Sequence, residues 1–212
     1  MSLIHSKNGQ SLNYFKRRYF LLLAISLITV FLQFLCGWWA DSVAVINDSF
    51  HTLTHSFGFL IAIFAEYSVE RVNYLDMTEK QSRINSTLAY YGVALACIIL
   101  VGIVLISHEA WERYQNPALI IGPIMILGAF IGIAGNGVFL FLIPPNKKTN
   151  VIPKLLTYDS WFDVAQSFLV LLTALIIYRF DIFILDSMIS FVLIGFMALI
   201  TLYALFTAFR QI

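Results

Sequence analysis

The sequence alternates between long apolar runs and short polar segments. Each run holds about 20 residues with few charges, which is the length that an α-helix needs to cross roughly 30 Å of hydrocarbon. We therefore expect an all-α polytopic membrane protein with six transmembrane helices, at about Tyr19–Trp39, Asp41–Ala65, Ser86–Ser107, Ala118–Ile143, Leu155–Tyr178 and Phe183–Phe206.

The composition agrees with this interpretation and narrows the domain organisation. Of the 212 residues, 60% are hydrophobic and only 12% are charged, and the mean hydropathy is +0.84. A soluble domain has about twice that share of charged residues. We expect a cytoplasmic tail over residues 1–18 and a six-helix membrane domain over residues 19–209, with no large soluble domain after it.

The polar segments between the runs predict the links between helices. We expect loops at residues 66–84 and in the stretch HEAWERYQNP, and a basic connector after the pair Pro144 and Pro145, which ends the preceding helix. His108 lies in HEAWERYQNP among acidic residues, so we expect its side chain to be solvated rather than to bind a ligand.

The basic residues predict the orientation in the membrane. With six spans, eleven of the 13 lysines and arginines fall on one side, and only Arg113 and Arg179 fall on the other. Because excess positive charge stays in the cytoplasm, we expect both termini there.

The second apolar run carries ionisable residues that are costly within a membrane. Asp48, His51 and His55 stand at positions i, i+3 and i+7, which lie along one stripe of an α-helix. Ionisable residues inside a span are rare and usually functional. This stripe is therefore our first candidate site.

The fifth run carries a matching pair. Asp159 and Asp163 stand at i and i+4, again on one helical face. Two imidazoles and two carboxylates from two helices form a ligand set suited to a divalent transition metal such as zinc. We expect His51, His55, Asp159 and Asp163 to be metal ligands.

Two other interpretations of these four residues remain open. In one, they are hydrogen-bonded or ion-paired and fix the helix register; in the other, they form only a proton relay, since histidine titrates near neutral pH. No glutamate follows His51 as the hydrolytic HExxH motif requires, and no nucleophile and base pairing is visible, so we do not expect an enzyme.

Several other polar or small residues in the runs are candidates for support of the site or for close packing. For Asp48 we consider a fifth ligand, a partner that orients His51 or a residue near the outer mouth, and we prefer the second. Asn136 and Gln33 are candidates for the same supporting role or for plain interhelical hydrogen bonds. Helices can approach closely at the small residues of the fourth run, Gly128, Gly132, Gly135 and Gly137.

Four segments of the chain resemble those of one transporter family. The stretch GWWADSVAVINDSFHTLTHSFGFL resembles the second-span signature of the cation diffusion facilitator family, and EAWERYQNP, GIAGNGVFLFLI and LDSMISFVLIGFMAL resemble its later segments. The family's ligand pairs on spans 2 and 5 match His51 and His55, and Asp159 and Asp163. The resemblance implies a homodimeric exporter that exchanges a divalent metal for protons, in a bacterial cytoplasmic membrane.

The sequence departs from the family pattern in two ways. Zinc-type members commonly place His then Asp on each span, whereas both histidines here lie on one span and both aspartates on the other; zinc stays the first choice, with manganese, iron, cobalt, cadmium and nickel open. Most members also continue into a cytoplasmic metal-binding domain, which we do not expect here. We expect metal as substrate and no prosthetic group, protons, lipid and a second copy as partners, and no nucleic acid. The competing hypothesis is a non-transporting membrane subunit that binds metal or acts as a scaffold.

Overall fold

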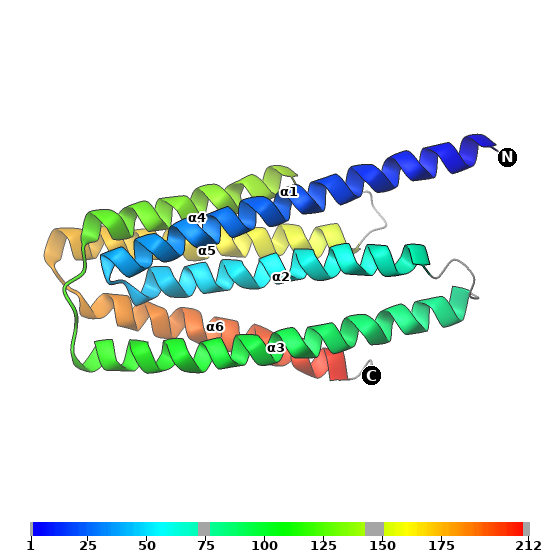
Figure 1. Cartoon of the computed structure of the whole chain (residues 1–212). Helices are drawn as coiled ribbons and strands as arrows, with labels where there is room; N and C mark the ends of the chain where they lie inside the picture. The colour runs from blue at the N-terminus through cyan, green and yellow to red at the C-terminus, as the bar shows by residue number, and fades with distance from the viewer. Residues whose placement is uncertain (1, 72–76, 143–150, 210–212) are drawn as a thin grey trace.

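A computed structural model gives the fold. It describes the backbone over residues 2–71, 77–142 and 151–209, and side chains over residues 20–57, 60, 89–142 and 160–209. Within these ranges the protein is all-helical, as predicted (Figure 1). The six helices are α1 (Ser2–Ala40), α2 (Val43–Arg71), α3 (Met77–Gln115), α4 (Gly122–Leu142), α5 (Val151–Phe180) and α6 (Ile184–Phe209).

Five of the helices are long and apolar enough to cross a membrane over the parts described, namely α1, α3, α4, α5 and α6. Much of α2 has side chains outside the described ranges. The six-span count and the cytoplasmic position of the termini therefore stay predictions.

Several helices extend further than the sequence indicated. The tail predicted at residues 1–18 is helical from Ser2, and the loop predicted at residues 66–84 is helical on both sides of residues 72–76, which lie outside the description. The prediction of a loop over HEAWERYQNP is also wrong, because α3 continues to Gln115. Charge suggested loops there, yet Glu, Arg, Lys and Gln are good helix formers, and only proline forces a stop.

The helices form two groups. α1, α2, α4 and α5 pack as a four-helix bundle, while α3 and α6 pair with each other and join it through contacts with α2 and between α5 and α6 (Figure 1). The short links at residues 41–42, 116–121 and 181–183 lie together at one end, which we call the link end. α1 begins and α6 ends at the opposite, terminal end (Figure 1). Every helix therefore runs between the same two ends.

Glycines of α4 let α1 pack closely against it. A Cβ atom added at Gly128 would lie 3.0 Å from Cys36 Cβ, and one at Gly135 would overlap Thr29. Gly132 meets Gln33 in the same way. These three predicted contacts are confirmed, whereas a Cβ at Gly137 would meet nothing within 4 Å, because this position falls off the shared face.

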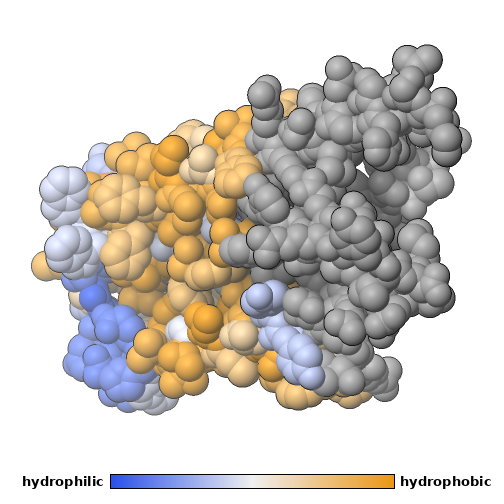
Figure 2. Space-filling model, turned by 45° about the vertical axis from the view of Figure 1, so that its right-hand side comes forward, coloured by the Kyte–Doolittle hydropathy of each residue, from blue (hydrophilic) through white to orange (hydrophobic). Residues whose placement is uncertain are grey.

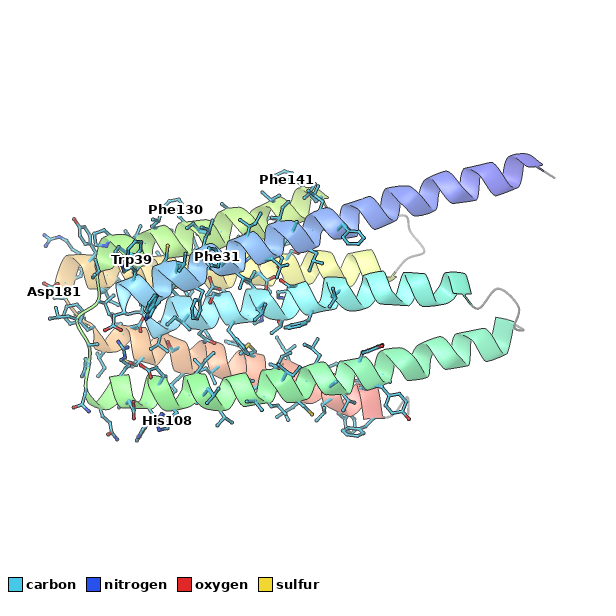
Figure 3. The ribbon with its side chains drawn as sticks, in the orientation of Figure 1. Phe31, Trp39, His108, Phe130, Phe141 and Asp181 are labelled. Atoms are coloured by element: carbon cyan, nitrogen blue, oxygen red, sulfur yellow. The ribbon has the colours of Figure 1, made fainter. Side chains whose placement is uncertain are left out.

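The outer surface is largely apolar. Figure 2 shows an apolar band over the coloured side of the molecule, with hydrophilic residues gathered at one end. Phe31, Phe130 and Phe141 point outward from the helices (Figure 3), and Trp38 and Trp39 are 70% and 73% exposed near the link end. An exposed apolar surface of this extent fits contact with lipid.

Asp186 at the start of α6 caps the N-terminus of α2. Its carboxylate accepts hydrogen bonds from Ser42 Oγ at 2.6 Å, Val43 N at 2.7 Å and Ala44 N at 3.2 Å. These backbone amides have no partner within their own helix. The cap thus fixes the start of the helix that carries both candidate histidines.

Replacing Asp186 by alanine is expected to destabilise the protein by about 2 to 3 kcal/mol, because two buried amides lose their acceptor. The midpoint of thermal unfolding in detergent should fall, while Asp181→Asn, at an exposed link residue with positive φ, should leave it unchanged. An unchanged midpoint for Asp186→Ala would contradict the capping role.

Candidate metal centre

Three of the four predicted ligands lie together between α2 and α5. His51 Nδ1 lies 3.3 Å from Asp163 Oδ1, and His55 Nε2 lies 3.2 Å from the same oxygen. The two imidazole rings meet edge to face, with centroids 5.0 Å apart. One ligand atom from each of the three residues lies within 4.8 Å of the other two. The helical spacing of the histidines therefore places both rings against one carboxylate.

The separations suit a tetrahedral metal site. Ligand atoms bound to zinc at about 2.0 to 2.1 Å in tetrahedral geometry lie about 3.3 Å from one another. The distances from both imidazoles to Asp163 already have this length. The same distances also fit imidazole–carboxylate hydrogen bonds, so geometry is compatible with either ligands or a register-fixing ion pair.

The side chain of Asp159, the fourth predicted ligand, lies outside the described residues. Its backbone belongs to α5, one turn from Asp163 toward the terminal end. Its role as a ligand stays a prediction.

Asp48 makes contacts that the sequence did not indicate. Its carboxylate accepts hydrogen bonds from Gln33 Nε2 at 2.7 Å and Ser167 Oγ at 2.9 Å on one oxygen, and from Gln166 Nε2 at 3.2 Å on the other. These donors belong to α1 and α5. Among the described residues these hydrogen bonds join Asp48 to two other helices, and its preferred role of orienting His51 stays a prediction.

Gln33 and Asn136 support Asp48 rather than the histidines. Gln33 donates directly to its carboxylate, and Asn136 Nδ2 donates to Ser167 Oγ at 3.3 Å, which in turn donates to Asp48. Gln33 and Asn136 are both fully buried. They were correctly singled out as buried polar groups, but their partner is Asp48.

Sequence reasoning missed Gln166 and Ser167. They follow Asp163 at i+3 and i+4, so they extend its face by one turn toward the link end, and they are polar residues within an apolar run. This pattern was available in the sequence. The residues selected from the sequence were those whose charge makes them costly to place inside a membrane, and glutamine and serine carry no charge.

Burial sets the electrostatics of the cluster. His51 and Asp163 are buried, with 6% and 3% of their surfaces exposed, and His55 is partly buried. A divalent cation buried beside one carboxylate retains a net positive charge, whereas two carboxylates neutralise it. Because an uncompensated buried charge is costly, a divalent cation at this point would need a second carboxylate nearby.

The apolar exterior and the buried histidine–aspartate cluster define a polytopic membrane protein with an intramembrane metal-site candidate. Comparison with protein families then identifies the family, since a model of the cation efflux transmembrane domain matches residues 19–212. The chain belongs to this family, the cation diffusion facilitators. Its apolar helices and bacterial relatives identify it as an integral inner-membrane protein.

Two curated relatives share part of the chain. The zinc transporter ZitB of Yersinia pseudotuberculosis serotype I (strain IP32953) is 30% identical over 125 residues, which cover 58% of this chain and 39% of the relative, and the zinc transporter ZitB of Yersinia pestis gives the same values. The match thus spans about two fifths of the length of these relatives.

Proposed function

We propose that the protein is a divalent metal efflux transporter, with zinc as the first candidate substrate. The observation that carries this proposal is the convergence of His51, His55 and Asp163 on one buried point between two helices. Family membership and the names of the ZitB relatives support transport of a metal cation. Asp159 completes the proposed ligand set from the adjacent turn of α5.

Proton exchange follows from the chemistry of the ligands. An imidazole must be neutral to bind a metal, so metal uptake releases protons and arriving protons favour metal release. Alternating exposure of a site near the middle of the membrane is how other secondary transporters move their substrates. The proposed mechanism therefore needs no ATP.

The proposed direction is from the terminal end, in the cytoplasm, to the link end outside. Its support is the distribution of basic residues, since Arg113 and Arg179 lie at the link end and the other eleven of the 13 fall near the terminal end of the predicted topology. A homodimer formed through the membrane helices belongs to the same proposal.

The deciding experiment is a flux assay on purified protein reconstituted into vesicles that contain a metal-sensitive dye. Zinc, cobalt, cadmium, manganese and iron are presented separately under an imposed pH gradient. We expect gradient-dependent flux of at least zinc, and loss of flux in His55→Ala.

The matched control is His108→Ala, because this histidine lies on the exposed side of α3 (Figure 3). Its flux should equal that of the unsubstituted protein. No flux for any metal from folded, zinc-binding protein would contradict transport and favour the non-transporting metal-binding subunit.

A further inference from the structure

A second polar centre lies beside the metal-site candidate. It consists of Asp48, Gln33, Gln166 and Ser167, and we call it the Asp48 junction. All four side chains are buried, with at most 6% of each residue exposed. Because the donors come from α1 and α5 and the acceptor from α2, the junction connects three helices across the centre of the four-helix bundle.

The fourth helix closes over the junction at a glycine. A Cβ atom added at Gly132 of α4 would lie 2.8 Å from Ser167 Oγ and 2.9 Å from Asp48 Oδ2, and it would overlap Gln33 Nε2. The backbone of α4 therefore rests directly on the hydrogen-bonded groups. No side chain other than hydrogen fits at this position without moving them.

The junction lies on the link-end side of the histidine–aspartate cluster. Asp48 precedes His51 by three residues on α2, and Gln166 follows Asp163 by three residues on α5. Because these two helices run in opposite directions, both offsets are displacements toward the link end (Figure 1). Polar contacts thus connect the two helices at two levels. The first is at the candidate ligands, and the second is at the Asp48 junction, about one turn further toward the link end.

Beyond the junction the core of the bundle is largely apolar. Buried residues of the same helices form one hydrophobic cluster toward the link end, which includes Ala44, Val45, Met125, Ala129, Val170 and Ala174. A cation that leaves the candidate site toward the link end meets the Asp48 junction first. Its polar groups can exchange their mutual hydrogen bonds for water, which the apolar residues cannot do.

We propose that the Asp48 junction holds the bundle closed on the link-end side of the metal site, by keeping α1, α2 and α5 together, and that these helices must separate for the cation to leave there. The proposal rests on the proposed transport function. Asp48 acts as a positioning residue, because three donors already occupy its carboxylate in this conformation. Opening requires that α1 and α5 separate from α2 at this level.

Cys36 offers a native reporter for the closed junction. It lies three residues beyond Gln33 toward the link end of α1, is 8% exposed, and packs where Gly128 brings α4 close to α1. Cys97, the other cysteine, is exposed. For the labelling experiment it is replaced by serine in every variant, so that only Cys36 can react. In intact cells a membrane-impermeant thiol reagent reaches only the outer side, and in inverted membrane vesicles it reaches only the cytoplasmic side.

We expect Cys36 to react about tenfold faster from the outer side in Asp48→Ala and in Gly132→Ala than in the unsubstituted junction, because each removes or displaces buried hydrogen bonds that hold it closed. Labelling from the cytoplasmic side should not increase. Asp48→Asn keeps an acceptor oxygen and the side-chain size, so it should restore protection in large part.

The matched control is Asn47→Ala. Asn47 is the adjacent buried polar residue of α2, but its side chain donates to the backbone of Ser190 on α6, away from the junction. In the Asn47→Ala variant, Cys36 should stay protected from the thiol reagent. Zinc affinity of the purified Gly132→Ala protein should stay within about threefold of the original, since all proposed ligands remain.

Protection of Cys36 in both junction variants, or equal acceleration from the two sides, would overturn the proposal, because the first shows that the junction does not hold the helices closed and the second shows general loosening of the bundle. The labelling readout needs no metal flux. Absence of flux from the unsubstituted protein with the expected one-sided labelling would therefore overturn the transport function alone and leave the closing role of the junction in place.

Discussion

Asp163→Ala is expected to weaken zinc binding by more than about 100-fold and to abolish gradient-driven flux, since loss of a supporting partner alone costs about 10- to 100-fold. Asp163 Oδ1 is the atom that both imidazoles approach, at 3.3 Å and 3.2 Å. Its removal leaves the two histidines of α2 and, on α5, only Asp159 of the proposed ligand set. Zinc binding is measured by calorimetry on purified protein in detergent, and flux in reconstituted vesicles.

Two further variants separate ligation from structure. Asp163→Asn keeps the shape but removes the charge, so it should also lose zinc binding, while Asp181→Asn at the exposed link after α5 should retain it. The unfolding midpoint is measured without metal for each variant. Unchanged zinc affinity in Asp163→Ala would assign the histidine–aspartate contacts to helix register instead of metal binding.

Zinc affinity is expected to fall as the pH decreases, by up to about tenfold per pH unit for each imidazole that must lose its proton. The sign follows from competition, because protonated imidazole has no lone pair for the metal. Two histidines in one site should therefore give a steeper pH dependence than one. The affinity is measured between pH 8 and pH 6, together with proton release on zinc addition in weak buffer.

Replacing single histidines identifies the source of this dependence. Any zinc binding that remains in His55→Ala should show a shallower slope, whereas His108→Ala, which changes an exposed residue of α3, should preserve the original slope. Binding that is independent of pH across this range would exclude His51 and His55 as ligands and would remove the basis for proton exchange.

Local features of the sequence predicted the helices and the faces of the candidate site. Apolar runs of membrane length give helices, and the spacing of His51 and His55 gives one face, because both depend only on neighbours within a few turns. Helix ends were less predictable. α3 continues through a charged segment that looked like a loop, since charged residues stop a span in the membrane without stopping a helix.

The sequence by itself determined the family, the all-helical fold and the chemical types of the candidate ligands, since each follows from residue identity and spacing. Only the tertiary structure decided that one oxygen of Asp163 meets both imidazoles, and that Asp48 accepts from Gln33, Gln166 and Ser167. The physical reason is that contacts between residues on different helices depend on the rotation and depth of each packed helix. Those quantities are set by close packing, such as that of α4 over Gly132, and local sequence periodicity does not contain them.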